Sequence, residues 1–237
     1  MPPRCLRKIS ETIRNQRVEK ITMSKAKDGI LGGFSGKVGT VVGRKWRGQY
    51  IMSAYKVSKN PRTQAQQDNR GRFAALGNLS GRFSSVAKMG LEAEALRMGT
   101  TARGRFISLN WPALSRDLDG TWMVSYPEIK TAQGPLANVV FDALDPQHGV
   151  MRIPFTAIAG EGDPRDEVVV FLYCPEAGYG VMETVVKAAE EIEVAMPTQF
   201  ENNKVQAWGF VRKYCNDAIP PVSNSTYIGE AIALPLI

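Results

Sequence analysis

The sequence predicts a mainly β protein with an α-helical segment in its N-terminal half. Three patterns lead to this expectation: a glycine-rich stretch with β-forming residues, an amphipathic helical pattern, and a long series of short alternating segments separated by turns. We therefore expect three regions along the chain. They are a flexible basic leader over residues 1–28, a basic β-ribbon and helical region over 29–110, and a β-sandwich domain over 121–237.

The ribbon is predicted from residues 29–57, where glycine recurs between valine, tryptophan and tyrosine. Branched and aromatic residues favour strands, and Arg47-Gly48 is a plausible turn between two of them. Glycine inside a strand often marks the close approach of another backbone. We expect this ribbon to pack against something.

A helix is predicted over roughly residues 63–90. The residue before Pro61 is biased away from helical geometry, so the helix begins after it. Thr63 and Gln66 have the spacing of a capping box. Apolar residues then recur at steps of three and four, and this places Phe73 and Phe83 in the core. Three glycines weaken the pattern by about 1 kcal/mol each, so the helix needs tertiary support or breaks in two, and a shorter helix follows over 91–109.

The sandwich is predicted from eight short β segments separated by turns rich in Gly, Pro, Asn and Asp. The last seven, within about 100 residues, match the strand number of an immunoglobulin or fibronectin III-like antiparallel β-sandwich. Trp208, flanked by Val205, Ala207 and Phe210, is expected in its core. The segments are 121–126, 137–143, 150–159, 167–174, 179–186, 191–196, 204–214 and 225–233.

The charge is unevenly distributed along the chain. Residues 1–105 carry 22 Lys and Arg against 6 Asp and Glu, a net charge of +16, whereas residues 106–237 carry 8 against 17, a net charge of −9. This imbalance points to an acidic partner for the first half: nucleic acid, an anionic protein face, or the second half of a neighbouring copy. The alternative is that the basic residues only solubilise a helical segment.

The residues offer little for catalysis, so we expect no enzymatic activity and no cofactor. The single histidine, His148, lies in a turn-like sequence, and no nucleophile motif accompanies it. The three cysteines are dispersed, which argues against a zinc site and for free buried thiols. The acidic loop 161–167 lacks the alternating ligands of a calcium loop, so we interpret it as a solvated loop. The glycine-rich run matches neither phosphate-binding fingerprint in spacing.

The candidate binding residues are basic side chains mixed with aromatic ones. Arginine contacts phosphate and an adjacent ring can stack on an unpaired base, so an exposed cluster would suit nucleic acid. A purely structural role for the aromatic rings is the alternative, with solvated arginine beside buried phenylalanine. The predicted binding residues are Arg44, Lys45, Trp46, Arg47, Tyr50, Arg62, Arg70 and Arg72.

The first part of the chain resembles a family of uncharacterised bacterial and bacteriophage proteins known only as a domain of unknown function. The resemblance lies in G-K-x-G-x-x-V-G over residues 36–43, W-R-G over 46–48, and N-P-R-T-x-x-Q-x-x-x-R-x-x-F over 60–73. A weaker similarity covers Val205, Trp208 and residues 225–229. The family supplies no activity or catalytic residues. A related N-P-[RK]-T helix start in small phage proteins implies a virion or assembly component.

We therefore expect a non-enzymatic structural protein of phage or prophage type, which docks through its basic N-terminal half. Its partners would be itself, as a homo-oligomer, or other virion proteins. The alternative is a nucleic-acid-binding protein that uses the same basic face, with the sandwich as an interaction module. No segment has the roughly 20 apolar residues of a membrane span or the apolar run of a secretion signal, so we expect a cytoplasmic protein that is later incorporated in a virion.

Overall fold

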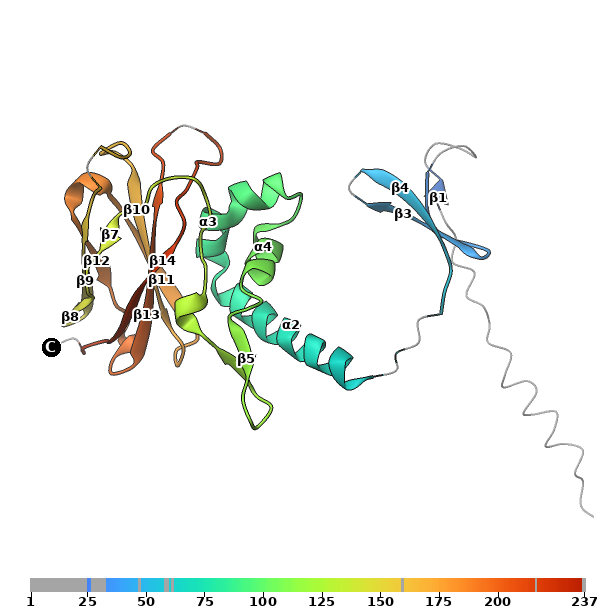
Figure 1. Cartoon of the computed structure of the whole chain (residues 1–237), viewed down its shortest axis with the longest axis horizontal. Coiled ribbons are helices and arrows are strands. Elements are labelled where there is room, and N and C mark those ends of the chain that lie inside the picture. Colours follow the sequence, from blue (N-terminus) through green and yellow to red (C-terminus); the bar gives the residue numbers. More distant parts are fainter. Residues whose placement is uncertain are drawn as a thin grey trace, which may run out of the picture. The chain divides into compact units, whose positions relative to one another are not determined.

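The computed structural model describes residues 25–26, 33–46, 48–57, 60, 62–158, 160–215 and 217–235. Its contacts divide the chain into two compact units, Met1–Pro61 and Arg62–Ile237 (Figure 1). We call the described part of the first unit the ribbon and the second unit the body. Among the helices that the structure describes, none is both long and apolar enough to cross a membrane.

The ribbon is one antiparallel sheet in the order β1-β2-β3-β4. Its strands are β1 (Lys25–Ala26), β2 (Phe34–Val38), β3 (Val41–Trp46) and β4 (Gln49–Ala54). Tight turns join β2 to β3 and β3 to β4, and Gly39 and Gly48 supply the positive φ angles that these turns require. The short strands predicted from the glycine-rich stretch are therefore present. The rest of the expected leader, apart from β1, lies outside the described residues.

The helical part of the body consists of α2 (Gln64–Arg82), α3 (Ser84–Arg97) and α4 (Ala102–Leu109). The start after Thr63 is as predicted, but the Thr63 side chain makes no capping hydrogen bond. The helix predicted over 63–90 breaks in two at Phe83, which is one of the two outcomes expected for it, and the Phe83 ring packs against Phe171, Tyr173 and Trp208. The predicted helix over 91–109 was wrong in its bounds, because α3 runs to Arg97 and the chain turns at Gly99.

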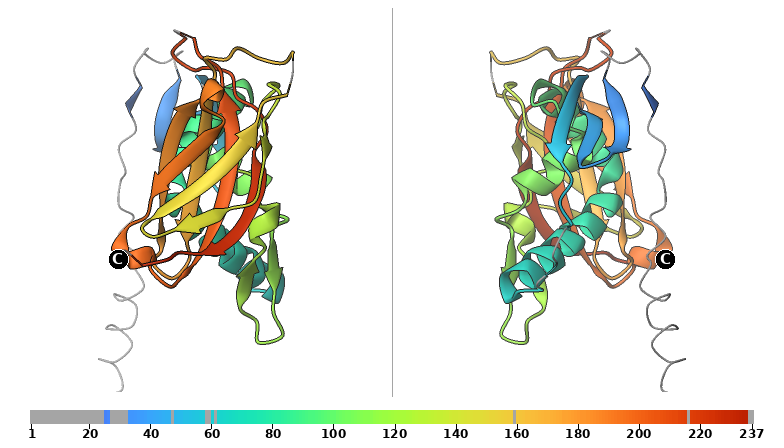
Figure 2. Two further views of the ribbon diagram at one scale, coloured as in Figure 1. Left: turned by 90° about the vertical axis from the view of Figure 1, so that its left-hand side faces the viewer. Right: turned by 90° about the vertical axis from the view of Figure 1, so that its right-hand side faces the viewer.

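Two larger antiparallel sheets and one small two-stranded sheet form the β part of the body (Figures 1 and 2). One of the larger sheets has the order β11-β10-β13-β14, and the other has the order β12-β9-β7 with β8 also paired to β9. Every predicted segment contains a strand. The strands are β6 (Trp122–Val124), β7 (Val140–Phe141), β9 (Val150–Thr156), β10 (Glu167–Cys174), β11 (Tyr179–Val186), β12 (Glu191–Ala195), β13 (Lys204–Arg212) and β14 (Thr226–Ile232), with the unpredicted β5 (Leu114–Arg116) and β8 (Asp145–Gln147).

The body has three layers, because the sheet containing β10 is covered on both faces. Alternate residues of β10 face opposite ways: Val168, Val170 and Leu172 join the core between the two sheets, whereas Val169 and Phe171 join a second core under the helices. The right-hand view in Figure 2 shows the helices lying across this sheet. The unbroken apolar run from Val168 to Cys174 in β10 is therefore explained by burial on both faces.

Trp208 is fully buried, as predicted, but it lies in the core under the helices and not between the two sheets. Its strand neighbours Val205 and Ala207 face the inter-sheet core. The division into regions also differs from the one expected, which grouped the helices with the ribbon. The helices belong to the body because Phe83, Leu91 and Phe106 share a core with the sheet.

Candidate binding surface

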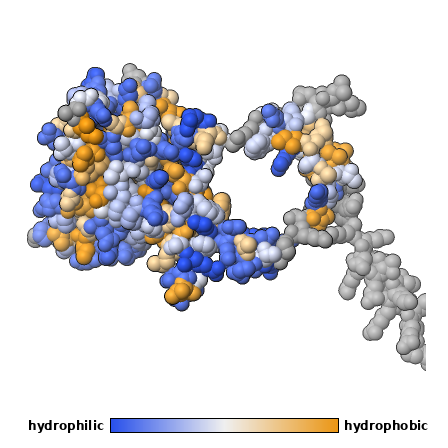
Figure 3. Space-filling view, viewed as in Figure 1, coloured by the Kyte–Doolittle hydropathy of each residue, from blue (hydrophilic) through white to orange (hydrophobic). Residues whose placement is uncertain are grey.

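The ribbon exposes large apolar and aromatic side chains. Trp46 is 54% exposed, Met52 62% and Tyr50 43%, and Val38 and Tyr55 are exposed as well. Figure 3 shows hydrophobic residues, in orange, on the surface of this small unit. Among the ribbon residues whose burial is described, within 33–57, only Gly43 is buried, under the Phe34 ring, so this part of the ribbon buries little apolar surface of its own. Apolar groups gathered on the surface in this way commonly mark an interaction site.

The strand register separates the ribbon side chains into two faces. Lys45 and Tyr50 are cross-strand partners, and the Lys45 ammonium lies 5.4 Å from the centre of the Tyr50 ring. Because Arg44 and Trp46 flank Lys45 in the strand, they point to the other face. Each face of the ribbon therefore carries both a cation and an aromatic ring.

The charge of the ribbon is of one sign. Residues 33–57 contain five lysines and arginines and no aspartate or glutamate. Lys37 lies 3.9 Å from the centre of the Tyr55 ring, and the described part of the chain offers Arg44 no ion-pair partner. A sheet with exposed rings and uncompensated positive charge can bind an anionic partner on either face.

Four of the eight predicted binding residues come together on the ribbon: Arg44, Lys45, Trp46 and Tyr50. Arg47 lies outside the described residues. Arg62, Arg70 and Arg72 belong to the other unit. Arg70 is exposed on α2, and the Arg62 carbonyl accepts a hydrogen bond of 2.8 Å from Gln67 Nε2.

Arg72 is held inside the body. Its guanidinium donates to the carbonyls of Trp111 and Leu114 and stacks over the Trp111 ring, 4.7 Å from the ring centre, with the centre of the Trp122 ring 5.8 Å away. These contacts connect α2 to the β5–β6 hairpin. The expected docking role does not suit a guanidinium that is engaged in this way.

The two phenylalanines predicted in the core differ in burial. Phe83 is fully buried, but Phe73 is 57% exposed, so its expected core position was wrong. The first turns of α2 extend past the sheet, as Figure 1 shows, and Phe73 is mostly exposed, whereas Leu76, about one turn further on, is fully buried. The helical periodicity places Phe73 and Phe83 in one apolar stripe. It does not show how far along that stripe the sheet extends.

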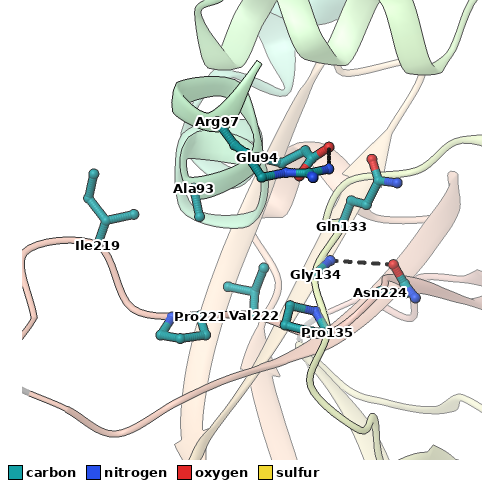
Figure 4. Close-up of a pocket in the computed structure, with 10 residues that line it drawn as sticks. All are labelled: Ala93, Glu94, Arg97, Gln133, Gly134, Pro135, Ile219, Pro221, Val222 and Asn224. Carbon is teal, nitrogen blue, oxygen red and sulfur yellow. Dashed lines mark hydrogen bonds and ion pairs between the residues drawn. The ribbon is translucent and has the colours of Figure 1, made fainter. Parts of the chain in front are cut away.

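The sequence analysis missed a groove in the body (Figure 4). It has a volume of about 640 Å³ and lies between α3 and the loops around residues 133–135 and 219–224. Glu94 faces it, paired with Arg97 at 2.7 Å and with Arg105 at 3.5 Å. The hydrogen bond from Arg97 lowers the pKa of the Glu94 carboxyl. No sequence signal marks this groove, because its walls come from segments that are distant in the chain.

The residues considered for catalysis or metal binding have structural contacts. His148 Nδ1 lies 3.0 Å from the Pro235 carbonyl oxygen, and burial raises the pKa of the Cys174 thiol, which makes it a poor nucleophile. In the acidic loop Asp166 is buried and accepts hydrogen bonds from the backbone of Asp163 and Tyr214, so this loop is only partly solvated. The part of the chain that the structure describes has no group of three His, Cys, Asp or Glu residues placed to hold a metal ion.

Fold and surface together define a class of protein: a helix-backed β-sandwich body preceded by a small basic ribbon. The chain belongs to a family of unknown function, DUF6266, whose model matches residues 33–229. This confirms the expected membership of an uncharacterised domain family. The match includes both the ribbon and the body.

The comparisons with curated proteins and with solved structures are less informative than the family match. No curated protein matches the chain. Among solved structures, the fibronectin III domain of the human collagen alpha-1(XX) chain is similar to 45% of this chain over 88% of its own length, with 12% identity and a TM-score of 0.30.

Proposed function

We propose that this protein is a non-enzymatic structural or assembly component that docks onto an anionic partner through its ribbon. The observation that carries the proposal is the exposure of Trp46, Tyr50 and Met52 on a sheet whose only charges are positive. Exposed rings supply contact area at low entropic cost, and the positive charges favour and steer a negative partner.

The net charges of the two units support a docking role for the ribbon. Residues 1–61 carry 14 Lys and Arg against 3 Asp and Glu, whereas residues 62–237 carry 16 against 20. The positive charge is therefore concentrated in the unit that contains the ribbon, and the body is slightly acidic. Head-to-tail association between the ribbon of one copy and the body of another is one form that the docking takes in this proposal.

In this proposal the sandwich of the body projects outward or contacts the neighbouring subunit. Seven of its strands, four in the sheet β11-β10-β13-β14 and three in the order β12-β9-β7, form two antiparallel sheets, and β8 adds a fourth strand to the second, which supports a fibronectin III-like module. The single histidine rests against a carbonyl oxygen, in keeping with a non-enzymatic role. The phage or prophage setting rests on the similarity of the helix start at residues 60–63 to small phage proteins.

Nucleic-acid binding is the second candidate, favoured by one observation. Trp46 and Tyr55 are exposed on the face that carries Arg44 and Lys37, and Tyr50 is exposed beside Lys45 on the other face, so each face offers a ring and a cation on which unpaired bases can stack. Each phosphate contact would steepen the dependence of log affinity on log salt by about 0.7 for a single strand.

Size-exclusion chromatography with light scattering at low and high salt, read at 260 and 280 nm, separates the two candidates. A nucleic-acid-free oligomer supports the assembly component, and its dissociation by salt assigns the contact to opposed charges. A nucleic-acid-rich complex that salt strips to clean protein supports the second candidate. A monomer that is free of nucleic acid at both salt concentrations contradicts docking to itself and to nucleic acid.

Charge reversal locates the contact. The double variant Arg44→Glu/Lys45→Glu should abolish whichever complex forms, whereas Lys88→Glu/Lys130→Glu, at two exposed lysines of the body, makes the same change in net charge and should leave it intact. Equal loss in both variants would point to net charge and not to the ribbon.

A further inference from the structure

The outer edge of β4 is open. In the order β1-β2-β3-β4 this strand is the last, and no other described strand pairs with it. An edge strand presents unpaired backbone N–H and C=O groups that can accept another strand. Most proteins obstruct such an edge with charge, proline or a bulge, but β4 reads Gln-Tyr-Ile-Met-Ser-Ala and contains none of these.

One hydrogen bond fixes which residues of β4 point outward. The Tyr55 N–H donates to the Thr40 carbonyl at 2.7 Å, so this pair is a hydrogen-bonded one. Such pairs alternate along an antiparallel ladder, and the register continues through Val42–Ser53 and Arg44–Ile51. The backbone groups of Ser53 and Ile51 therefore point to β3. Those of Tyr50, Met52 and Ala54 point to the open edge.

The side chains along this edge suit an apolar contact. Tyr50 and Met52 lie on one face and Ile51 on the other, and a strand added at the edge would place its own side chains beside them. An added strand would therefore gain hydrogen bonds from three outward residues and apolar contact on both faces.

The positive charge near β4 restricts which kind of molecule can bind to its open edge. Arg44 and Lys45 lie one strand away, within the roughly 8–10 Å over which charges are felt at physiological salt, and Lys56 follows the end of β4. A second ribbon would bring the same five cations and be repelled. A nucleic acid has no backbone N–H groups to satisfy the outward carbonyls of β4. A polypeptide with acidic side chains satisfies both requirements.

We propose that the open edge of β4 binds an extended acidic segment of a partner protein by antiparallel strand addition. The backbone groups of Tyr50, Met52 and Ala54 pair with the segment, Tyr50 and Met52 contact its apolar residues, and the lysines and arginines of the ribbon face its carboxylates. This inference rests on the proposed docking function and specifies its geometry and its partner.

The test measures backbone amide exchange by NMR in the full-length chain. The probe is a capped eight-residue peptide of alternating glutamate and valine. At a free concentration ten times its dissociation constant, the amides of Tyr50, Met52 and Ala54 should exchange about tenfold more slowly, because only about a tenth of the edge remains free. The Ile51 and Ser53 amides, already paired to β3, should change little.

Two controls separate strand addition from attraction between charges. The same peptide with N-methyl groups on alternate residues keeps its charge but loses the hydrogen bonds of one edge, so it should bind far more weakly. In the protein, Met52→Pro removes one outward N–H at a place where an edge strand tolerates proline, and Met52→Leu is the matched control. If Met52→Pro disturbs the fold of the ribbon, the comparison with the N-methylated peptide still tests whether the segment binds by strand addition.

The outcomes distinguish this inference from the function on which it rests. Binding without protection of the three amides, or equal binding of the methylated peptide, overturns strand addition but leaves the ribbon as a docking surface. If the peptide fails to bind and a thymidine oligonucleotide binds instead, both the inference and the assembly function fail, and the nucleic-acid candidate takes their place.

Discussion

Single residues show how charge patterns alone mislead about binding. Arg72 and Arg44 are both arginines near aromatic residues in the sequence, yet Arg72 is engaged by two tryptophans and Arg44 is exposed on a strand. The difference depends on Trp111 and Trp122, about 40 and 50 positions further along the chain. An arginine in such a position stabilises the fold through stacking and hydrogen bonds to carbonyls.

Replacing Arg72 should therefore reduce stability. Arg72→Ala should lower the free energy of unfolding by about 2 kcal/mol, because it removes two hydrogen bonds to carbonyls and the contact with both rings. Urea denaturation followed by tryptophan fluorescence measures this. Arg72→Lys keeps the charge but not the planar fork, and should recover less than half of the loss. Gln66→Ala, at an exposed position of the same helix, is the control, and an equal effect there would contradict the assignment.

Asp163 should titrate at unusually low pH. Hydrogen bonds from the Arg165 side chain and backbone lower the pKa of Asp163 to about 2. Because the folded pKa lies below the ordinary value of 3.8, the contribution to stability is complete above pH 4 and is lost as the pH falls through about 2. The group is solvent-exposed, so the effect on overall stability is small.

The measurement is a carboxyl carbon titration by NMR. Arg165→Ala should raise the pKa of Asp163 toward its ordinary value, whereas Lys88→Ala, at a lysine elsewhere on the surface, should not. An unchanged pKa of Asp163 in the Arg165 variant would show that Arg165 does not cause the shift.

Among the elements, helix placement depends on close contacts that glycine permits. Gly90 of α3 lies against the backbone of residues 131–132, and a Cβ there would be 2.6 Å from the Ala132 Cβ. Gly81, near the end of α2, has open space around it. Helix propensity treats both as equal helix-weakening residues, but their surroundings differ.

These two glycines give opposite predictions. Gly90→Ala should lower the free energy of unfolding by about 1–3 kcal/mol through overpacking. Gly81→Ala should raise it by about 0.5–1 kcal/mol, because alanine reduces the entropy of the unfolded chain and favours the helix. Thermal and urea denaturation of both variants is the check, and the same sign for both would contradict the packing described for α3.

Across the whole molecule, the hydrophobic cores lie in one unit, and the binding that we propose is assigned to the other. The two hydrophobic cores contain residues of the body alone. Within residues 33–57 the ribbon buries a single residue, Gly43, so most of its apolar surface stays exposed.

The body should accordingly fold without the ribbon. A fragment of residues 62–237 should keep its free energy of unfolding within about 1 kcal/mol of the full chain, which corresponds to a shift in melting temperature of about 2–4 °C for a domain of this size. Circular dichroism melts of the two proteins test this. A fragment that is unfolded or much less stable would mean that the ribbon supplies part of the core.

Local sequence patterns were enough to establish the β segments, the start of α2, the turn at Gly48, and the concentration of positive charge near the N-terminus. These features follow from periodicity, turn chemistry and composition, which act over a few residues. The helix bounds after Phe83 were beyond such patterns, because the break there is fixed by packing of the Phe83 ring against the sheet.

Long-range packing settled which element covers each face. It placed Trp208 and Phe83 under the helices, joined those helices to the body, engaged Arg72 and left Trp46 and Tyr50 exposed. The physical reason is that the hydrophobic periodicity of a helix or strand shows which residues share a face. Whether that face is buried depends on segments that are far away in the chain. The open edge of β4 has the same origin, because the position of a strand in a sheet is set by pairing and not by its own residues.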